Sequence, residues 1–503
     1  SCTGPSEAFT ITVNPTAQLE STPNQVLCHQ ESTEEIIFSS ENTGGTTSYS
    51  WINDNVAIGL ASTGDGNISS FVTADVVASS ISSTITVTPT YSNNGISCTG
   101  PSEAFTITVN PTAQVESIPN QVLCNQEFTE EIMFSTENTD GTTSYSWTND
   151  NVAIGLVSAV GSGNIGSFNA TNTTSQAQTA TFVVTPSYTN NGVSCEGLSE
   201  TFTITVNPSA QVNEILNQDL CEGQITSPIN FSTTNVDGNT EYSWTNDNTN
   251  IGLAESGDGN ILSFTVLNNS GESEAATITV VPTYSSSGVD CVGSAYTFVL
   301  VVNPRAQVNP IENQILCNGD LLMPIQFNTT NIDGASAYTW TNSNTLIGLA
   351  STGTGDIGAF EVVNTTTSAQ QALITVTPIY TNNSVVCSGD PEQFTIIVNP
   401  SAQVNAVSSY NAVLCDGEFT PVYTFTTANT DGLTTFAWAN DNVGIGLPSS
   451  GAGGIPSFAV SNTTQSTVFA TITVTPSYEN NGIVCEVSPE TFTILVNPLP
   501  TMD

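Results

Sequence analysis

A unit of about 97 residues occurs five times along the chain, and this period constrains the fold more than any single residue. A fixed period of this length indicates a tandem array of small domains, because each unit is large enough to bury a core of its own. Two markers follow the period. The prolines of a recurring Val-Asn-Pro are Pro15, Pro111, Pro208, Pro304, Pro400 and Pro498, and the tryptophans are Trp51, Trp147, Trp244, Trp340 and Trp438.

The period predicts the domain boundaries. The five repeats are expected at residues 16–111, 112–208, 209–304, 305–400 and 401–498, with the start of a next linker at 499–503. Residues 1–15 match residues 97–111 and are expected to be the last strand of a preceding repeat, so the chain is expected to be a segment of a longer polypeptide. Each linker is short and contains proline, which predicts limited bending between repeats.

Within one repeat, short apolar runs alternate with turn signals. In the second repeat, strands are predicted over residues 131–135, from Tyr145 onward, over 181–185 and over 202–206. Asn191-Gly192 is a strong hairpin signal, since both residues tolerate a positive φ. No segment has helical periodicity. Several short strands around a central tryptophan predict an all-β fold, a tandem array of immunoglobulin-like β-sandwich domains, with the five tryptophans in the cores.

The charge of the chain is strongly negative. It has 45 acidic residues, one Lys or Arg (Arg305) and one histidine (His29), for a net charge of −44. Such a chain would be repelled by nucleic acid and by anionic membranes, so neither is expected as a partner. No apolar run is long enough to cross a bilayer, and membrane insertion is not expected either.

Ten cysteines recur in register, two in each repeat, which predicts an oxidising, extracellular location. Pairing within a repeat is the favoured scheme, although an immunoglobulin-like topology separates the two cysteines of one repeat. Pairing between neighbouring repeats and free thiols remain open alternatives. The candidate residues are Cys28, Cys98, Cys124, Cys195, Cys221, Cys291, Cys317, Cys387, Cys415 and Cys485.

Calcium is the cofactor that the acidic residues could hold, since carboxylates and amide oxygens are its usual ligands. Weak candidates lie in the Asp-Gly turns and in the Asn-Asp-Asn runs. Gly44 and Ser343 interrupt the two series, and plain turns are the favoured interpretation, so no cofactor is expected. The turn residues are Asp140, Asp237, Asp333 and Asp431, and those of the runs are Asp54, Asp150, Asp247 and Asp441.

An enzymatic function is not expected. His29 and Arg305 have no counterparts in the other repeats, which is typical of surface positions and not of a catalytic group. The Gly-x-Gly stretches, such as residues 64–66 and 257–259, precede strand-like residues and not a helix, so they are expected to be tight turns and not phosphate loops.

The recurring residues resemble a known family. In the second repeat the pattern comprises Asn-Gln-x-x-Cys at 120–124, Tyr-x-Trp-x-Asn at 145–149, Ile-Gly-Leu from Ile154, Thr-Pro-x-Tyr at 185–188 and Phe-Thr-Ile-x-Val-Asn-Pro at 202–208. It is similar to the PKD-like repeats of very large surface proteins of Bacteroidota, with Leu300 and Asp320 as departures. The resemblance implies an adhesin or a gliding-associated filament at the cell surface, exported by the type IX system.

Two functions are consistent with these observations. One is a structural stalk or filament segment that extends a distal binding region, with other repeats of the same chain as partners. The alternative is an array that binds surface glycans weakly at each repeat, or that contacts neighbouring filaments. An array of this kind requires exposed aromatic rings at equivalent positions. The candidates are Tyr91, Tyr188, Tyr284, Tyr380 and Tyr478, for which a core role is the simpler expectation.

Overall fold

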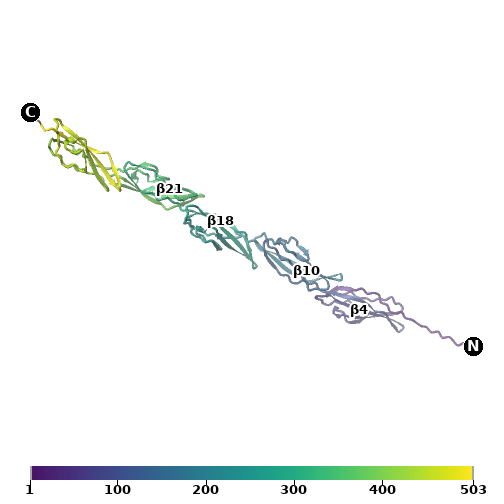
Figure 1. The fold of residues 1–503 in the computed structure, drawn as a ribbon. Coiled ribbons are helices and arrows are strands. Elements are labelled where there is room, and N and C mark those ends of the chain that lie inside the picture. Colours follow the sequence, from purple (N-terminus) through teal and green to yellow (C-terminus); the bar gives the residue numbers. More distant parts are fainter. Residues whose placement is uncertain (1–2, 501–503) are drawn as a thin grey trace. The chain divides into compact units, whose positions relative to one another are not determined.

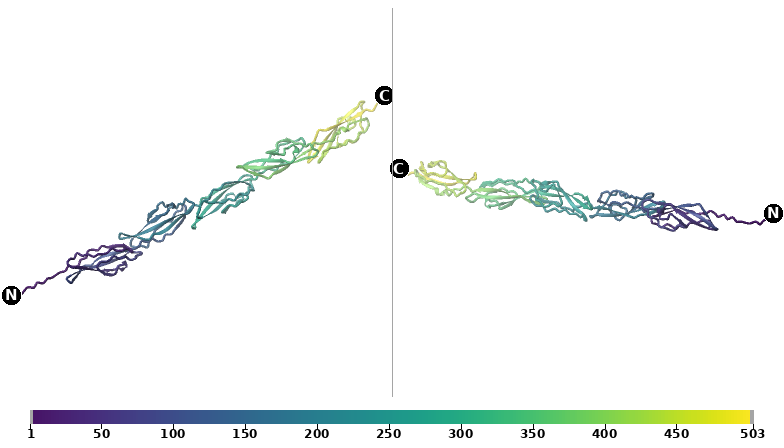
Figure 2. Two further views of the ribbon diagram at one scale, coloured as in Figure 1. Left: turned by 180° about the vertical axis from the view of Figure 1, so that it is seen from behind. Right: turned by 90° about the horizontal axis from the view of Figure 1, so that it is seen from below.

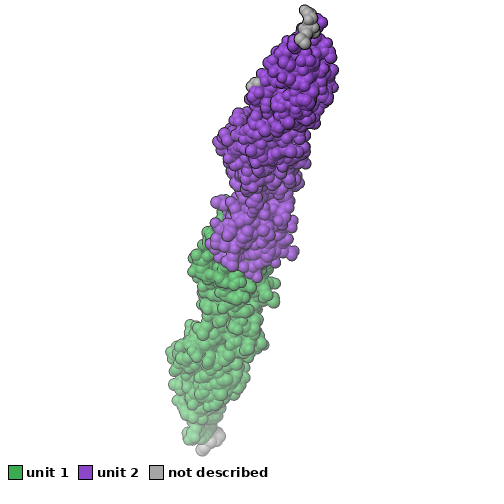
Figure 3. Space-filling model, turned by 90° about the vertical axis from the view of Figure 1, so that its left-hand side faces the viewer, with its two compact units in different colours: residues 1–214, 231–243, 280–296 green, residues 215–230, 244–279, 297–503 purple. Residues whose placement is uncertain are grey.

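The computed structural model describes residues 3–500 and divides the chain into two compact units (Figure 3). Unit 1 comprises residues 1–214, 231–243 and 280–296, and unit 2 comprises residues 215–230, 244–279 and 297–503. The first and second repeats lie in unit 1, the fourth and fifth lie in unit 2, and the third contributes to both.

The same succession of strands and one-turn 3-10 helices recurs in every repeat (Figures 1 and 2). The first has β1 Gln25–Cys28, β2 Thr46–Asn53, η1 Val56–Ile58, β3 Thr63–Asp65, β4 Ile81–Asn93, β5 Ile96–Thr99 and β6 Glu103–Asn110. The second has β7 Gln121–Cys124, β8 Thr142–Asn149, η2 Val152–Ile154, β9 Val160–Ser162, β10 Gln178–Asn190, β11 Val193–Glu196 and β12 Glu200–Asn207. The third has β13 Gln218–Cys221, β14 Asn239–Asn246, η3 Thr249–Ile251, β15 Ser256–Asp258, β16 Glu274–Ser286, β17 Val289–Val292 and β18 Tyr296–Asn303.

The fourth repeat has two additional short strands, β20 and β23, and the fifth has an additional 3-10 helix, η5. The fourth has β19 Gln314–Cys317, β20 Leu321–Leu322, β21 Ala335–Asn342, η4 Thr345–Ile347, β22 Thr352–Thr354, β23 Phe360–Glu361, β24 Gln370–Asn382, β25 Val385–Ser388 and β26 Glu392–Asn399. The fifth has η5 Val407–Tyr410, β27 Ala412–Cys415, β28 Leu433–Asn440, η6 Val443–Ile445, β29 Ser450–Ala452, β30 Val468–Asn480, β31 Ile483–Glu486 and β32 Glu490–Asn497.

Each repeat is built on one six-stranded sheet, which confirms the predicted all-β, immunoglobulin-like class. In the second repeat the order is β7-β12-β10-β8-β9, and β11 pairs with β10 in a hairpin. The first strand pairs with the last in parallel, which brings Cys124 beside Asn207. The predicted hairpin forms at Asn191, whose φ of 49° lies in the left-handed region.

Alternation along β10 explains how the sheet covers the core. Its inward residues Ala180, Phe182 and Val184 are fully buried, while Thr181 and Val183 between them lie on the other face and are half-buried. Trp147 is 8% exposed and packs with Phe182 in this core. The tryptophans of the other repeats are each 7% exposed, so all five lie in the cores, as the sequence predicts.

The layer opposite the sheet is less regular than the sequence predicts. No strand forms over residues 131–135; Ile132 makes a single bridge to Ile165. The amide of Phe134 donates instead to the side-chain Oδ1 of Asn164, at 3.0 Å. This side-chain acceptor replaces the next ladder bond, and the segment stays extended without becoming a strand.

Residues 3–15 form no strand, in contrast to the prediction for residues 1–15; residues 1 and 2 lie outside the described part of the chain. Phe9, Ile11 and Val13 are 83%, 75% and 84% exposed. In the identical segment of the first repeat these residues are buried in β6. The segment at 3–15 has no sheet because β1 and β4 already pair with β6. The predicted linker at 499–503 falls largely outside the described residues.

Arg305 is the one Lys or Arg of the sequence, so few carboxylates can have a cationic partner. Arg305 contacts Asp390 at 2.8 Å and Glu222 at 3.8 Å, and His29 contacts Asp75 at 3.0 Å. These side chains are 24–83% exposed, and pairs at the surface contribute little to stability. The remaining carboxylates repel one another.

We therefore expect sodium chloride to stabilise the fold. Raising the concentration from about 0.02 to 0.5 M shortens the screening length to under ~8 Å, which weakens the repulsion among the carboxylates. The melting temperature, followed by circular dichroism, should rise by several degrees. A melting temperature that falls over this range would contradict the expectation. The same titration with calcium at matched ionic strength controls for specific ion binding.

Candidate functional site

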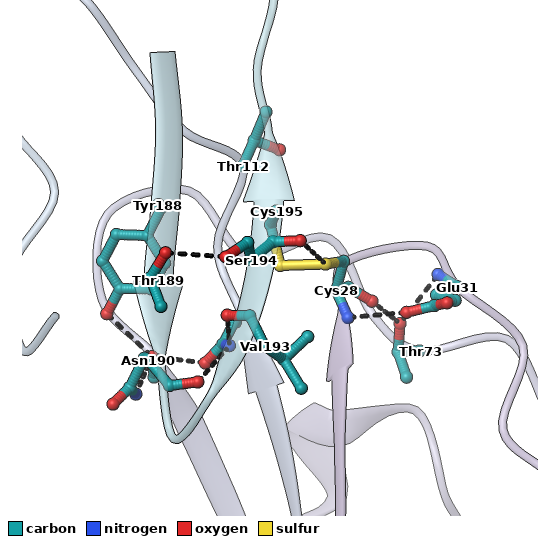
Figure 4. The surroundings of a disulfide bond; sticks show 12 residues. Cys28, Glu31, Thr73, Thr112, Tyr188, Thr189, Asn190, Val193, Ser194 and Cys195 are labelled. Carbon is teal, nitrogen blue, oxygen red and sulfur yellow. Dashed lines mark hydrogen bonds between the residues drawn. A yellow bond between two sulfur atoms is a disulfide. The ribbon is translucent and has the colours of Figure 1, made fainter. Parts of the chain in front are cut away.

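The contacts between neighbouring repeats are the feature that recurs most closely, and the contact between the first and second repeats shows its parts. The parallel pairing of β1 with β6 places Cys28 next to Asn110 at one end of the sheet. The β10–β11 hairpin of the second repeat presents Cys195 opposite Tyr188. Figure 4 shows the disulfide between Cys28 and Cys195, with an S–S length of 2.01 Å and a Cα–Cα distance of 5.5 Å.

Local hydrogen bonds hold Cys28 in position for this bond. The carboxylate of Glu31 accepts from the Cys28 amide at 2.9 Å, and the hydroxyl of Thr73 donates to the Cys28 carbonyl at 2.9 Å (Figure 4). The Glu31 amide donates to the same hydroxyl at 3.1 Å. Side chains of the first repeat therefore hold the end of β1 in place without any contact from the second repeat.

An asparagine clamp lies beside the disulfide. Asn110 Nδ2 donates to the carbonyls of Asn190 and Val193, at 3.1 and 3.3 Å, at the tip of the hairpin. Ser80 Oγ lies 3.0 Å from the hydroxyl of Tyr188 and accepts from Asn190 Nδ2 at 2.8 Å. We call Asn110 and Ser80 together the clamp. The disulfide and the clamp join the end of one sheet to the hairpin of the next repeat.

The three other contacts have the same plan. Each one bonds the first cysteine of a repeat to the second cysteine of the following repeat, and each lies within one compact unit. In unit 1 the further pair is Cys124–Cys291, and in unit 2 the pairs are Cys221–Cys387 and Cys317–Cys485. The clamp recurs as Asn207 on the Ser286 carbonyl at 3.0 Å and as Asn399 on the Asn480 carbonyl at 3.1 Å.

The favoured within-repeat pairing is therefore wrong, and the alternative of bonds between neighbours is found. The reason is the length of the central strand. Cys28 lies at the end of the sheet where β4 begins, and Cys98 lies opposite Tyr91 near the other end of β4. About ten strand residues separate the two ends, or ~33 Å, far beyond the ~7 Å that a disulfide allows. Among the described cysteines, Cys98 and Cys415 are free.

The linker is packed and not loose. Ala113 is 2% exposed, and its carbonyl oxygen would lie 1.8 Å from a Cβ added at Gly197. Only a glycine therefore lets the linker pass this closely along its own repeat. Pro111 before it is buried as well. These contacts leave little freedom between the last residue of one sheet and the body of the next repeat.

The serine of the clamp is missing from two contacts, and this has a measurable consequence. Asn207 is fully buried, and its Oδ1 has no hydrogen-bond partner within residues 3–500; the position equivalent to Ser80 is Ala177. In the first repeat the Ser80 hydroxyl donates to Asn110 Oδ1 at 3.1 Å.

Ala177→Ser is expected to supply the missing donor and to stabilise the second repeat by ~1 kcal/mol. Hydrogen exchange of the amides in β12 measures the effect, and Ser80→Ala in the first repeat is the matched reverse change. If Ala177→Ser destabilises the second repeat while Ser80→Ala is neutral, this account of the clamp is incorrect.

The calcium candidates have structural roles at their positions. Asp140, Asp237, Asp333 and Asp431 adopt left-handed φ values of 63–66°, and Gly44 adopts 82° at the equivalent position. A turn that needs a positive φ explains why glycine can replace aspartate there. Across residues 3–500, no three side chains of His, Cys, Asp or Glu come close enough together to hold a metal ion.

The aspartates of the Asn-Asp-Asn runs bind the neighbouring long strand of their own repeat. Asp54, Asp150, Asp247 and Asp441 each accept from a backbone amide at 2.6–2.7 Å. The hydrogen bond from the Thr84 amide, followed by that from the Ser83 hydroxyl, lowers the pKa of Asp54. In the same runs, Asn151 and its counterparts cap the one-turn helices η1–η4 and η6, for which the sequence shows no helical periodicity. An Asn two residues after the buried Asn149 is the signal that could have found them.

The tyrosines proposed as glycan platforms are buried. Tyr91 is 1% exposed, and the four others are fully buried. Their hydroxyls donate to carbonyls of their own repeat, as Tyr188 does to Thr139 at 2.8 Å. A groove of about 500 Å³ beside the second linker is lined by residues such as Glu116, Glu137 and Leu198, and its lining includes no aromatic ring. The glycan-binding alternative therefore loses the residues on which it depended.

Comparison with known proteins agrees with the repeat pattern. A family model described as "PKD-like domain" matches residues 218–306 and 314–402. These two matches fall on the third and fourth repeats. No curated protein sequence matches the chain.

Solved structures similar to the chain include human desmocollin-1 ectodomain, with 10% identity, 98% of this chain and 99% of that chain covered, and a TM-score of 0.22. Sidekick-1 immunoglobulin domains 1–5 match with 10% identity, coverages of 97% and 100%, and a TM-score of 0.21. Mouse cadherin-23 EC22-24 matches with 12% identity, coverages of 57% and 99%, and a TM-score of 0.29. Scores this low transfer no function to this chain.

The helical segments within residues 3–500 are single 3-10 turns, and none of them could cross a lipid bilayer.

Proposed function

We propose that this chain is a structural stalk segment of a large exported surface adhesin, which holds a distal binding region away from the cell. The observation that carries the proposal is the covalent bond at every contact between neighbouring repeats. A chain whose role were to present five independent binding domains would gain nothing from bonds that tie each domain to the next. A stalk gains resistance to bending and to unfolding.

The packed linkers and the clamps support the same role. Ala113 and Pro111 are buried, and Asn110 binds the hairpin of the next repeat, so the contact is held by more than the disulfide. Four disulfides form in an oxidising compartment, which supports an exported, extracellular location. Export by the type IX system and a link to gliding remain part of this proposal and rest on the family resemblance.

Catalysis is not part of the proposed function. His29 in the first repeat and Arg305 in the fourth each contact a carboxylate, and neither has a counterpart in the other repeats. We propose no metal or cofactor, and no membrane-inserted part.

Electron microscopy of the purified, oxidised chain tests the proposal. Five repeats that follow one another end to end would extend to roughly 200 Å, since thirteen strand residues span ~40 Å. Particles of this length with limited bending are expected, and reduction should increase the bending. Compact particles, or beads that bend freely before reduction, would reject the stalk. Glycan-array binding that requires several repeats would favour the alternative function.

A further inference from the structure

Two of the hairpins that enter the contacts between repeats carry a chemically reactive dipeptide at their tips. Asn191-Gly192 forms the tip of the β10–β11 hairpin, and Asn481-Gly482 forms the tip of the β30–β31 hairpin. We propose that Asn191 and Asn481 are sites of spontaneous conversion to aspartate and isoaspartate, and that docking of each hairpin on the preceding repeat controls the rate of this conversion.

The reaction needs only the two residues of the tip and water. The backbone nitrogen of Gly192 attacks the side-chain carbonyl carbon, Cγ, of Asn191. The new N–C bond closes a five-membered succinimide ring, and the side-chain nitrogen leaves as ammonia with the proton that the Gly192 amide gives up. Water then opens the ring at one of its two carbonyls and yields aspartate, or isoaspartate, in which the main chain runs through Cβ. Glycine favours the attack because it has no Cβ to hinder its nitrogen.

The tips are open to the water that the reaction consumes. Asn191 and Gly192 are both exposed, and a Cβ added at Gly192 would meet no atom within 4 Å. Asn481 and Gly482 are exposed in the same way, and the surroundings of Gly482 are equally open. No neighbouring side chain therefore blocks attack, departure of ammonia or opening of the ring.

The contact between repeats restrains the motion that ring closure requires. Asn191 has a left-handed φ of 49°, and its neighbours Asn190 and Val193 pair with each other across the hairpin. Asn110 of the preceding repeat donates to the carbonyls of both neighbours, at 3.1 and 3.3 Å. Asn191 has to rotate its backbone to bring Cγ onto the Gly192 nitrogen, so ring closure follows a local opening in which the tip leaves Asn110.

Another Asn-Gly pair shows how the fold can protect the dipeptide. Asn318 is half-buried, its Oδ1 accepts from the Asn364 amide at 2.7 Å, and its Nδ2 donates to the Ser401 hydroxyl at 2.9 Å. The Gly319 nitrogen, which would have to attack, donates to the Val362 carbonyl at 2.9 Å. Both reacting groups are held apart by bonds of their own, so Asn318 should convert far more slowly than Asn191.

The third and fourth hairpins are internal comparisons with other residues at the tip. Their tips are Ser287-Gly288 and Asn383-Ser384, and all four residues have a positive φ. The turn therefore needs left-handed residues but does not need asparagine followed by glycine. Ser287 has no amide to lose, and the side chain of Ser384 hinders its nitrogen. Only the first and the last of the four contacts thus contain a reactive tip.

Conversion would weaken the contact in two ways. Each product adds a carboxylate to a chain that already has a net charge of −44. Isoaspartate also adds one backbone carbon to a two-residue turn, whose geometry sets the register of the hairpin. The Asn190 and Val193 carbonyls would then no longer match the position of Asn110, and the contact would loosen as the protein ages.

Peptide mapping of the oxidised chain, kept folded in mildly alkaline buffer for several weeks, measures the reaction. Aspartate and isoaspartate should accumulate at Asn191 and Asn481, and roughly tenfold more slowly at Asn383, because Ser384 has a side chain. Asn110→Ala removes both bonds to the second hairpin and should speed conversion of Asn191 several-fold. Asn481 is an internal control, since Asn399 still binds the Asn480 carbonyl at 3.1 Å and the rate at Asn481 should not change.

Two further variants complete the test. Ser80→Ala removes the bond from Asn190 Nδ2 and should also speed conversion of Asn191, which keeps the test available if Asn110→Ala does not fold. Asn191→Gly cannot convert, and Gly-Gly suits the same turn. Hydrogen exchange of the β11 amides should become faster with age in the natural chain but not in the Asn191→Gly chain.

Two results would overturn the inference. One is an Asn191 that stays unconverted in both the natural and the clamp-deficient chains while it converts in the reduced, denatured chain. The other is conversion at one rate whether or not the clamp is present. The inference does not depend on the stalk function, because the reaction concerns the docked hairpin whatever the chain supports.

Discussion

Stretched from its two ends with its disulfides intact, the chain is expected to reach less than a third of the length that it reaches after reduction. The cause is that each bond spans parts of two repeats, with cysteines 166–168 residues apart, so successive loops overlap. The shortest covalent path follows the backbone only between the bonds. It runs from the N-terminus to Cys28, from Cys195 to Cys221, from Cys387 back to Cys317 and from Cys485 to the C-terminus.

The magnitudes follow from the reach of an extended chain. At roughly 3.4 Å per residue the shortest path is ~500 Å long, against ~1700 Å for all residues without the bonds. A second route through Cys124–Cys291 exists beside the first. Loss of one outer bond, Cys28–Cys195 or Cys317–Cys485, is expected to lengthen the limit by about a fifth, and loss of one inner bond should leave it almost unchanged.

Single-molecule stretching of the chain, held at its ends, measures this limit. Reducing agent added during the experiment should release the remaining length, and a Cys124→Ser/Cys291→Ser double variant serves as the control that barely changes the limit. Full extension without reduction would show that the bonds are absent.

Gly161→Ala is expected to destabilise the second repeat by about 2–4 kcal/mol, because it forces the core to rearrange. A Cβ at position 161 would lie 2.0 Å from Cζ2 of Trp147. The tryptophan is 8% exposed and packs on Phe182, so its ring cannot move without opening the core. The same close approach occurs at Gly64, Gly257, Gly353 and Gly451, at 2.0–2.4 Å from the equivalent tryptophan.

Gly166 is a matched control in the same repeat. A Cβ at Gly166 meets nothing within 4 Å, and its φ is not positive. Gly166→Ala should therefore change the stability by less than ~1 kcal/mol. Hydrogen exchange of β8 and β9 compares the two variants locally, which is necessary because five repeats do not unfold as one two-state system. Equal effects would mean that the tryptophan does not require a glycine beside it.

Much of the fold can be predicted from the sequence, because the regular part of each repeat has strong local signals. The alternation in residues 181–185 and 202–206 and the Asn191-Gly192 turn correspond to strands and a hairpin of the structure. Residues 131–135 have the same alternation but form only one bridge, since Asn164 competes for the amide of Phe134. Asn164 lies thirty residues from Phe134, so the sequence around residues 131–135 does not reveal this hydrogen bond.

The candidate site was harder to predict, because it consists of contacts between repeats. The regular spacing of the cysteines indicates that they matter but is the same for both pairing schemes. What decides between them is that β4 is thirteen residues long and separates the two cysteines of one repeat. The topology alone suggests that the two cysteines of one repeat lie apart. The strand length that excludes a bond between them comes from the structure. The core role expected for the tyrosines is confirmed, because Tyr188 continues the buried alternation of β10.

Peptide mapping without reduction tests most directly whether the disulfides join neighbouring repeats. A protease that cuts beside acidic residues separates all the cysteines involved, since Glu31, Glu127 and Glu196 lie close to them. After alkylation of free thiols, mass spectrometry should find the Cys28 peptide linked to the Cys195 peptide and the Cys124 peptide linked to the Cys291 peptide. A Cys28 peptide linked to the Cys98 peptide, or both recovered as alkylated thiols, would contradict the account.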